Sequence, residues 1–399
     1  MLQSPHRNIV RTGTNACWRR TSSLEIIVDN TETVKTEITA EAYADLASQV
    51  GGEPTAKLST YSSSSPILRS QIRHWGVMTG DMRPLFVDLD YAKASPWKTL
   101  VAPQGVLVHQ ERFDAEIDGL VGCKAVMSSV DIEWHQPIKL GDTMVPKTTI
   151  TDVQEKPTDT SRAVTIVTDT AINNPDGKSI GTLHSTWECC ERGSAEHKQL
   201  FGDRTEPHFY GEEDIDAIAE EYKTEQARGT DALTGDAVNV GDETPHVLKG
   251  PTTREGNMTS GTSRWFWGHA QGFELLEKAP ELFFENENHA MEPVSGLESS
   301  HHRAQRWGGV PGVLELNNER VHWLVHTLMN WMGDAGFITR MSLSFPRCNI
   351  VGDVTRSYGK VTAKNVDGDR TIVDMDVWQV NQLGERITEG TAQVALPTA

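Results

Sequence analysis

Two absences narrow the class of protein that this sequence can encode. The chain of 399 residues holds five cysteines at irregular spacings, without a Cys-x-x-Cys pair. Such cysteines indicate neither a disulfide framework nor a zinc site, and a reducing compartment is expected. No apolar run approaches the roughly 20 residues that cross a bilayer. The sequence therefore predicts a soluble chain that folds around its own apolar cores.

Positive charge is also scarce. Lys and Arg number 37 against 56 Asp and Glu, for a formal net charge of -19. Nucleic acids and anionic membranes bind basic surfaces, so neither is expected as a partner. A few local cations or a helix N-terminus can still hold a small anionic ligand. The length is sufficient for two or three domains.

The N-terminal segment differs from the rest of the chain. It carries Arg7, Arg11, Arg19 and Arg20, several Ser and Thr residues, and no acid before Glu25. This composition is typical of an organellar transit peptide, although a disordered basic tail or an upstream start codon produces the same pattern. We expect a cytoplasmic protein, with a mitochondrial or other organellar location as the alternative.

The chain repeats a local pattern. Residues 139–143 read Lys-Leu-Gly-Asp-Thr, and residues 350–354 read Ile-Val-Gly-Asp-Val. Each Gly-Asp tract is followed, after nearly the same interval, by a Gly-containing turn, at residues 174–177 and 381–384. Two β-rich stretches with matching turns indicate a duplicated unit.

Each unit has one apolar helix ahead of its Gly-Asp tract. Residues 317–331 place apolar side chains at spacings of three and four, and Gly333 follows, which predicts a helix. The counterpart in the first unit is expected at residues 103–110. β-Branched or alternating stretches predict strands at residues 148–153, 163–172, 371–380 and 391–396. A sheet that wraps around one buried helix is a hot dog, so the sequence predicts an α+β double hot-dog fold.

A polar segment separates the two units. Residues 193–240 are rich in Glu, Asp, Gly and Thr and include an acidic helical stretch at residues 212–227. We interpret them as an acidic linker that runs over the surface. The remaining parts are an N-terminal extension (1–34), an N-terminal hot dog (35–192) and a C-terminal hot dog (241–399).

Several tracts resemble the MaoC-like hydratase and dehydratase family. Residues 80–86 read Gly-Asp-Met-Arg-Pro-Leu-Phe and are followed by a Tyr-Ala, where the family has Gly-Asp, Asn-Pro-Leu-His and then Tyr-Ala. Residues 101–105 resemble the approach to the family's central helix. Tracts of the second unit are similar to the second domain of two-domain members, and they lie at residues 309–312, 330–334, 351–353 and 381–385. The resemblance covers most of residues 35–190 and 240–397, and it implies activity on an acyl-CoA thioester.

The family pairs an Asp with a His five residues later. In the first unit Asp81 fits the Asp, but Phe86 occupies the position of the His. Phe cannot transfer a proton, so the resemblance implies a degenerate first half. Phe86 would then line an apolar tunnel for the acyl chain or coenzyme A.

The second unit matches the motif in the opposite way. His302 fits the His, whereas Leu297 occupies the position of the Asp. A shift of one residue makes Glu298 and His301 the pair. We therefore expect the catalytic site at Glu298, His301 and His302, with Asp81 as a further candidate.

The resemblance also implies a reaction. Backbone N–H groups near Asn317 and Asn318, at the start of the second helix, would polarise the thioester carbonyl. A carboxylate and an imidazole would hold a water over C3 and pass a proton to C2, and dehydration is the reverse. The reaction needs no metal or redox cofactor, and coenzyme A enters as part of the substrate.

Other interpretations remain open at this point. His301 and His302 also suit a solvated turn, Asp81 a simple turn, and His322 with His326 a buried structural role. Two further functions fit the sequence: a non-catalytic subunit that binds a CoA ester and completes a partner's site, and a hot-dog thioesterase in which a carboxylate activates water. Because hot-dog sheets commonly pair, we expect a homodimer.

Overall fold

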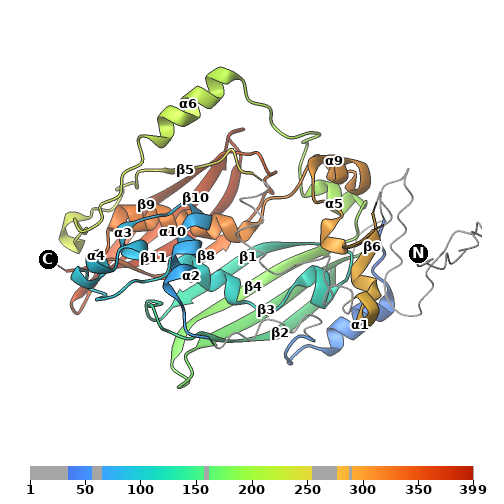
Figure 1. Ribbon diagram of the computed structural model, residues 1–399, viewed down its shortest axis with the longest axis horizontal. Coiled ribbons are helices and arrows are strands. Elements are labelled where there is room, and N and C mark those ends of the chain that lie inside the picture. The colour runs from blue at the N-terminus through green and yellow to red at the C-terminus, as the bar shows by residue number, and fades with distance from the viewer. Residues whose placement is uncertain (1–34, 56–64, 157–160, 254–275, 287–289, 399) are drawn as a thin grey trace, which may run out of the picture.

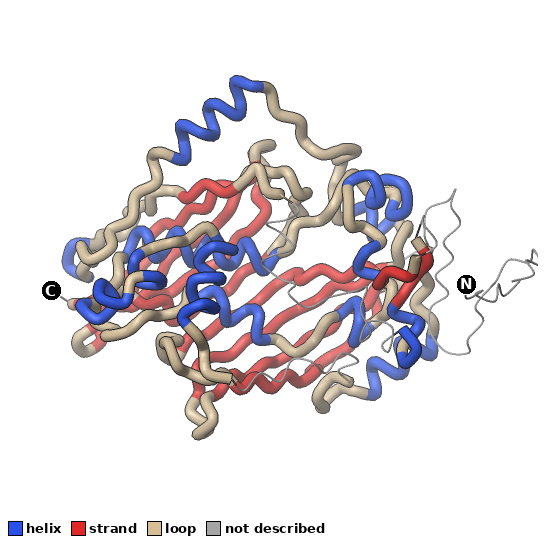
Figure 2. Tube along the Cα trace, viewed as in Figure 1, coloured by secondary structure: helices blue, strands red, loops and turns tan. Residues whose placement is uncertain are grey.

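The computed structural model describes residues 35–55, 65–156, 161–253, 276–286 and 290–398. One antiparallel sheet of nine strands dominates it, in the order β2-β3-β4-β1-β8-β11-β10-β9-β5 (Figures 1 and 2). Its strands are β1 (Lys124–Trp134), β2 (Val145–Lys156), β3 (Ala163–Asn173), β4 (Ser179–Cys190), β5 (Val247–Lys249), β8 (Phe337–Ser344), β9 (Thr355–Asp367), β10 (Arg370–Asn381) and β11 (Arg386–Pro397).

The two predicted units form the two halves of this sheet. β1 to β4 come from the first unit, β8 to β11 come from the second, and β1 pairs with β8 at the centre, where Val130 lies opposite Leu343. The stretches expected as strands lie within β2, β3, β10 and β11. The predicted α+β double hot-dog arrangement is therefore confirmed, because each half carries its own helix and the halves share one sheet.

The Gly-Asp tracts have the same structure in both halves. The carboxylate of Asp142 accepts a hydrogen bond from the amide of Lys139 at 2.7 Å, and that of Asp353 accepts from Ile350 at 2.8 Å. Gly141 and its counterpart both have a positive φ, 90° and 107°, which favours glycine. In each half the same tract also forms a β-bridge to the segment before the central helix. These matched turns confirm the duplication.

The second central helix, α10 (Asn317–Met332), is the core element of the molecule. All of its residues except Asn318 are buried, as expected of a helix enclosed on every side. Leu324 and Leu328 belong to the largest apolar cluster, which extends into both halves. The predicted helix at residues 317–331 is confirmed to within one residue.

The first central helix is shorter and broken. It consists of a 3₁₀ turn, η1 (Gln104–Gln110), and a π turn, η2 (Ala115–Gly119). η1 crosses α10 closely, since His109 Nε2 lies 2.9 Å from His322 Nε2, and a Cβ on Gly105 would lie 2.5 Å from His322 Nδ1. The helix expected at residues 103–110 is present as the 3₁₀ turn η1. Its close contact with α10 limits the space available to it.

The remaining elements are short. The helices are α1 (Ala40–Ser48), α2 (Arg69–Thr79), α3 (Pro84–Val87), α4 (Leu89–Ala94), α5 (Ala195–Gln199), α6 (Glu212–Tyr222), η3 (Gly235–Ala237), η4 (Pro280–Leu282), η5 (Val294–Gly296), α9 (His301–Arg303) and η6 (Ala304–Gly308). β6 (Phe283–Glu285) and β7 (Met291–Pro293) form a separate pair. Figure 1 shows α2 close to α10, which places a first-half segment against the second half's helix.

The segment between the halves is more than a surface linker. α6 is mostly exposed and stands away from the sheet (Figure 1), and it ends at Tyr222 rather than at residue 227. His197 and Phe201, however, are buried. The interpretation of residues 193–240 as a surface linker is therefore wrong around α5, because two side chains there pack inward.

No helix among the described residues is long and apolar enough to cross a membrane. The candidate transit segment, residues 1–24, lies outside the described residues.

Candidate active site

A buried ion pair forms where α2 ends. The helix stops at Gly80, whose φ of 65° is left-handed, and the amide of Asp81 donates to Gly76 O at 2.9 Å. Arg83 then precedes Pro84, the first residue of α3. These turns bring the buried side chains of Asp81 and Arg83 together, with Arg83 Nη2 2.7 Å from Asp81 Oδ2.

α10 adds an imidazole and an amide to this ion pair. His326 and Asn330 are one turn apart, so both lie on the same face of the helix. Arg83 Nη2 donates to Asn330 Oδ1 at 3.1 Å, and His326 Nε2 lies 3.8 Å from Asp81 Oδ1. Asp81, from the first half's motif, therefore faces the second half's central helix.

The segment after α6 adds a second carboxylate. Glu225 Oε1 lies 2.9 Å from His326 Nε2 and accepts from Asn330 Nδ2 at 3.1 Å. Lys249, at the end of β5, donates to Gly80 O at 3.2 Å. The Glu225 side chain is 30% exposed, so the group reaches the surface there. We call it the junction cluster: Asp81, Arg83, Glu225, Lys249, His326 and Asn330.

The charges of the cluster keep both carboxylates ionised. Burial alone would raise the pKa of Asp81, but the charge and hydrogen bonds of Arg83, together with the charge of Lys249, lower that pKa. Burial would likewise raise the pKa of Glu225, yet the hydrogen bond from His326 and nearby positive charge bring it to about 2. Both side chains are therefore anionic near neutral pH.

His326 is held as a neutral imidazole. Burial lowers its pKa more than the charge of Asp81 and the hydrogen bond to Glu225 raise it. A neutral imidazole carries one N–H, and Glu225 beside Nε2 places that proton on Nε2. Nδ1 then has the lone pair, and this buried atom has no hydrogen-bond partner among the described residues. The arrangement resembles the general case of an imidazole held at one nitrogen by a carboxylate and free to exchange a proton at the other.

Glu298 lies in a second buried cluster at the opposite junction. It forms an ion pair with Arg192, lies 3.5 Å from Lys124 Nζ and 3.3 Å from His197 Nε2. Glu116 also pairs with Arg192, at 3.1 Å. Burial would raise the pKa of Glu298, but Arg192 and Lys124 hold it well below its usual range. Two carboxylates are thus balanced by two cations, in a setting typical of a structural ion network.

His301 and His302 lie outside both clusters. His301 is half-buried, and its Nδ1 accepts a hydrogen bond from the amide of Val313 at 3.2 Å. His302 is exposed. Within the described ranges no hydrogen bond or ion pair joins either imidazole to Glu298. The structure therefore does not bring together the three residues that the motif suggested as a catalytic group, and their catalytic role stays a prediction.

Of the residues expected to contact the substrate, Phe86 and Asn317 are buried. Phe86 packs in the main apolar cluster, beneath the guanidinium of Arg83. Asn317 Nδ2 donates to Met127 O at 2.6 Å, and Asn318 is half-buried. Burial raises the pKa of the neighbouring Glu315 to about 8. Their contacts with a thioester stay predictions.

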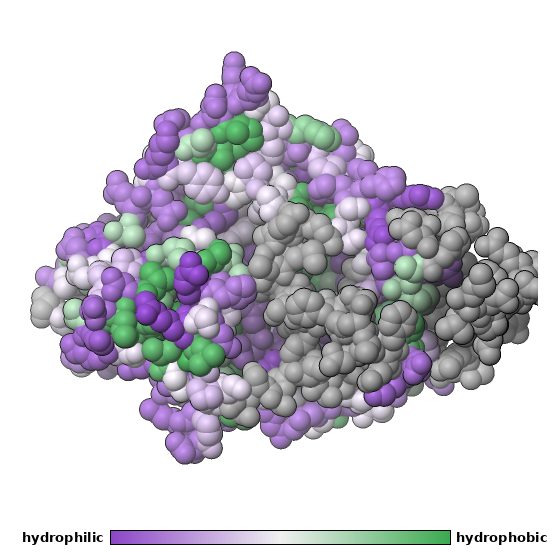
Figure 3. Space-filling view, in the orientation of Figure 1, coloured by the Kyte–Doolittle hydropathy of each residue, from purple (hydrophilic) through white to green (hydrophobic). Residues whose placement is uncertain are grey.

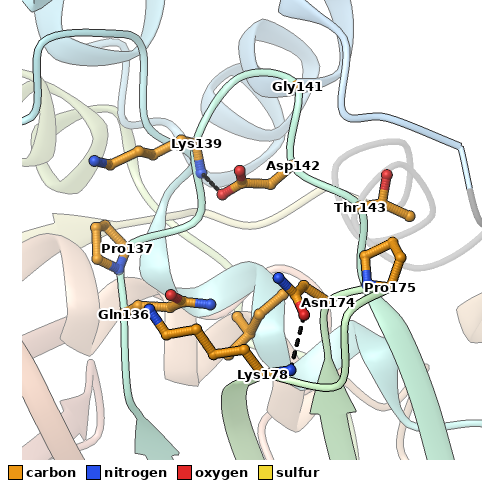
Figure 4. A pocket seen from close by; sticks show the side chains of 10 residues that line it. Gln136, Pro137, Lys139, Gly141, Asp142, Thr143, Asn174, Pro175 and Lys178 are labelled. Carbon is orange, nitrogen blue, oxygen red and sulfur yellow. Dashed lines mark hydrogen bonds between the residues drawn. The ribbon is translucent and has the colours of Figure 1, made fainter.

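A surface pocket of about 420 Å³ opens between the β1–β2 loop and the β3–β4 hairpin (Figure 4). Lys139 and Lys178 contribute to its wall. Asp142 and Asn174 accept backbone hydrogen bonds from these same two lysines, at 2.7 and 2.8 Å. The polar groups therefore stabilise the two turns, and we assign the pocket no catalytic role.

Exposed apolar side chains flank the junction cluster. Leu68, Val77 and Met82, on or beside α2, are large and exposed, and Figure 3 shows apolar atoms gathered over the α2–α4 region. The described residues include no group of three or more His, Cys, Asp or Glu side chains that could bind a metal ion.

Sequence reasoning found Asp81 but missed most of its partners. The one-turn spacing of His322 and His326 predicts a buried structural role, whereas His326 contacts Asp81 and Glu225. Glu225 and Lys249 could not be identified as members of the cluster, because nothing in their local sequence indicates that they approach α10.

Comparison with known families supports a dehydratase relationship for the first half. Residues 57–183, which include Asp81, match the family described as "FAS1-like, dehydratase domain region". The comparison with curated proteins gives no match.

Solved structures similar to this chain have the same fold. A "MaoC-like dehydratase" has a TM-score of 0.56 at 16% identity, over 89% of this chain and 100% of its own. A putative MaoC domain dehydratase from Chloroflexus aurantiacus has a TM-score of 0.53 at 9% identity, over 84% and 93%. A Mycobacterium tuberculosis protein described as a double hot dog has a TM-score of 0.50 at 9% identity, over 84% and 94%.

The family match and the fold agree with the resemblance drawn from residues 80–92 and the second-half tracts. The chain therefore has the double hot-dog fold of the MaoC-like dehydratases, and its residues 57–183 match a FAS1-like dehydratase region.

Proposed function

We propose that the protein adds water to a 2-enoyl-CoA, or removes it from the 3-hydroxyacyl-CoA, with His326 as the acid–base residue. The observation that carries this proposal is the contact of His326 with Asp81 and Glu225 across the junction of the two halves. Asp81 lies in the matched dehydratase region. The motif His is absent at Phe86, and we assign its role to His326 of α10.

The proton transfer follows from the state of His326. Its Nδ1 lone pair takes a proton from water as the water oxygen bonds to C3, and the same nitrogen then gives the proton to C2. One water O–H bond and the C2–C3 π bond break, while a C3–O and a C2–H bond form. Dehydration reverses each step, and the reaction as written requires neither metal nor redox cofactor.

Two cations of the junction cluster suit the charge that develops. Hydration places negative charge on the thioester oxygen, and fixed positive charge in a site with little water stabilises it. Arg83 and Lys249 are buried next to Asp81 and Gly80. We keep the N–H groups near Asn317 and Asn318 as the alternative source of this stabilisation.

The junction cluster reaches the surface at Glu225, whereas the Glu298 cluster is enclosed. The side chains of Glu225 and His326 are 30% and 4% exposed, and those of Glu298 and His197 are 6% and 0% exposed. We therefore expect water and substrate to approach the buried His326 from the Glu225 side of the cluster.

The test is loss of enoyl-thioester absorbance with a panel of 2-enoyl-CoAs. We expect turnover by the wild type and a loss of about 10²- to 10⁴-fold in kcat for His326→Gln, the usual contribution of a general acid–base group. The exposed His302→Gln variant is the matched control and should keep its activity. Far-UV circular dichroism shows whether the His326 variant is folded.

Two outcomes would overturn the proposal. Full activity in His326→Gln with loss in His301→Gln or His302→Gln would return the site to the second-half motif. Binding of CoA esters without turnover by the wild type on any substrate would favour a non-catalytic subunit.

A further inference from the structure

We propose that Glu225 is a positioning residue for His326, so that the segment between the two hot dogs is a third part of the active site. This inference rests on the proposed function of His326. We call residues 221–233 the connector. The two halves supply Asp81 and His326, and the connector supplies the carboxylate that lies within hydrogen-bond distance of the imidazole, 2.9 Å from Nε2.

The connector is fixed to the end of α10 by its backbone. The amide of Arg228 donates to Asn330 O at 3.1 Å, and the amide of Leu233 donates to Met332 O at 3.0 Å. Because α10 also carries His326, these hydrogen bonds fix the position of the connector relative to the imidazole.

The other end of the connector is held by side chains. Glu221 accepts two hydrogen bonds from Arg356 of β9, both at 2.6 Å, and lies 2.8 Å from His246 Nε2. Tyr222 OH donates to Gly250 O at 2.7 Å. Glu225 therefore lies between two anchored points, which restricts where its carboxylate can go.

Glu225 also makes more than one contact. Its Oε1 is the acceptor for Asn330 Nδ2 at 3.1 Å, while Asn330 Oδ1 accepts from Arg83. Asn330 thus links Glu225 to the ion pair in the first half. A carboxylate held in this way has one favoured position relative to the imidazole.

Several charged side chains face His326, and they differ in how closely they contact its imidazole. Asp81 is engaged by three hydrogen bonds from Arg83 and remains 3.8 Å from His326 Nε2. Lys249 of β5 and Arg83 place positive charge nearby. Glu225 is therefore the carboxylate that fixes the Nε2–H tautomer and leaves Nδ1 as the proton acceptor.

The experiment compares Glu225→Gln and Glu225→Ala with Glu220→Gln. Glu220 is the matched control, since it lies on α6 and its side chain is 72% exposed. We expect kcat to fall by roughly 10- to 100-fold in Glu225→Ala with little change in KM, the scale seen when a partner that orients a functional imidazole is removed. Glu225→Gln keeps an acceptor oxygen, so it should lose less.

Two readouts separate positioning from a merely structural role. The hydrogen bond to Glu225 raises the pKa of His326, so the acidic limb of the kcat profile should move to lower pH in Glu225→Ala. Nitrogen NMR of the imidazole should show the Nε2–H tautomer in the wild type and a loss of that preference in Glu225→Ala. Unchanged kcat, pH profile and tautomer in Glu225→Ala would overturn the inference.

The NMR readout keeps the two proposals distinguishable. If the wild type turns over no enoyl thioester, the proposed function fails, whereas a tautomer change in Glu225→Ala would still establish that Glu225 holds the imidazole. If the wild type is active but the tautomer is unchanged, the inference about Glu225 fails alone.

Discussion

At the residue scale, burial determines how much the free energy of unfolding falls when a charged residue of the junction cluster loses its partner. Asp81 and Arg83 are each about 95% buried, and their attraction compensates for the loss of water around both. A carboxylate left alone in such a place is strongly unfavourable. The pair thus contributes to stability mainly by avoiding an unpaired charge.

Replacement of Arg83 by Met tests this view of the ion pair. The variant leaves Asp81 buried without its main partner, so we expect a loss of about 3–5 kcal/mol in the free energy of unfolding. Urea unfolding measures it, and the Asp81→Asn, Arg83→Met double variant should recover part of the loss. An unchanged urea midpoint in Arg83→Met would contradict the account.

Glu225 should make stability depend on pH in acid. Its pKa is near 4.5 in the unfolded chain and about 2 in the folded protein. A lowered carboxylate pKa contributes stability that is complete above about pH 4.5 and is lost as the pH falls toward 2. Wild type should therefore lose more stability than Glu225→Gln across this window, as followed by thermal unfolding. Parallel curves would argue against the contact with His326.

At the residue scale, the sequence predicts Asp81 as a site residue but not the side chains that it contacts. Asp81 was found because its neighbours at residues 80–92 resemble a family motif. Its imidazole partner is on a helix 245 positions further along the chain, and no local pattern reports such a contact. His301 and His302 matched the motif in sequence, yet their contacts are with a backbone amide and with solvent.

At the scale of elements, local sequence patterns predicted the main helix and several strands. The apolar spacing of residues 317–331 identified α10, and β-branched runs identified four strands, because both patterns arise from which side chains face a core. The break in the first central helix was not visible. It depends on how closely η1 approaches His322 of α10, which is a tertiary contact.

Gly105→Ala tests that crossing of the two central helices. The new methyl group would lie 2.5 Å from His322 Nδ1, so α10 or η1 must shift, with an expected loss of roughly 1–3 kcal/mol. Gly211→Ala is a suitable control, because its Cβ would meet only Asp214 Oδ2 at an ordinary 3.5 Å. A midpoint of thermal unfolding equal to that of wild type would show that the helices are less tightly packed than described.

At the scale of the whole molecule, the two hot dogs share one sheet and one core. β1 and β8 join the halves, the main apolar cluster includes side chains from both, and each buried charged cluster draws residues from both. The duplication was visible in the Gly-Asp tracts. The contacts between the halves, in which charged residues of one half approach the helix of the other, could not be predicted from the sequence.

This sharing predicts one unfolding transition. Circular dichroism and tryptophan fluorescence should report the same urea midpoint, since neither half keeps its core when the other is lost. Residues 35–192 expressed alone should fail to give a cooperative transition. Two separate transitions, or a stable isolated half, would contradict a shared core.

The pH dependence of kcat/KM for 2-enoyl-CoA hydration tests the central claim most directly. The account predicts that the wild type loses activity as the pH falls through an ionisation below the usual 6.5 of histidine, because burial lowers the pKa of His326 and only the neutral imidazole accepts a proton. His326→Gln should be at least about 100-fold slower and lack that ionisation. A folded His326→Gln variant with the rate and profile of the wild type would contradict it.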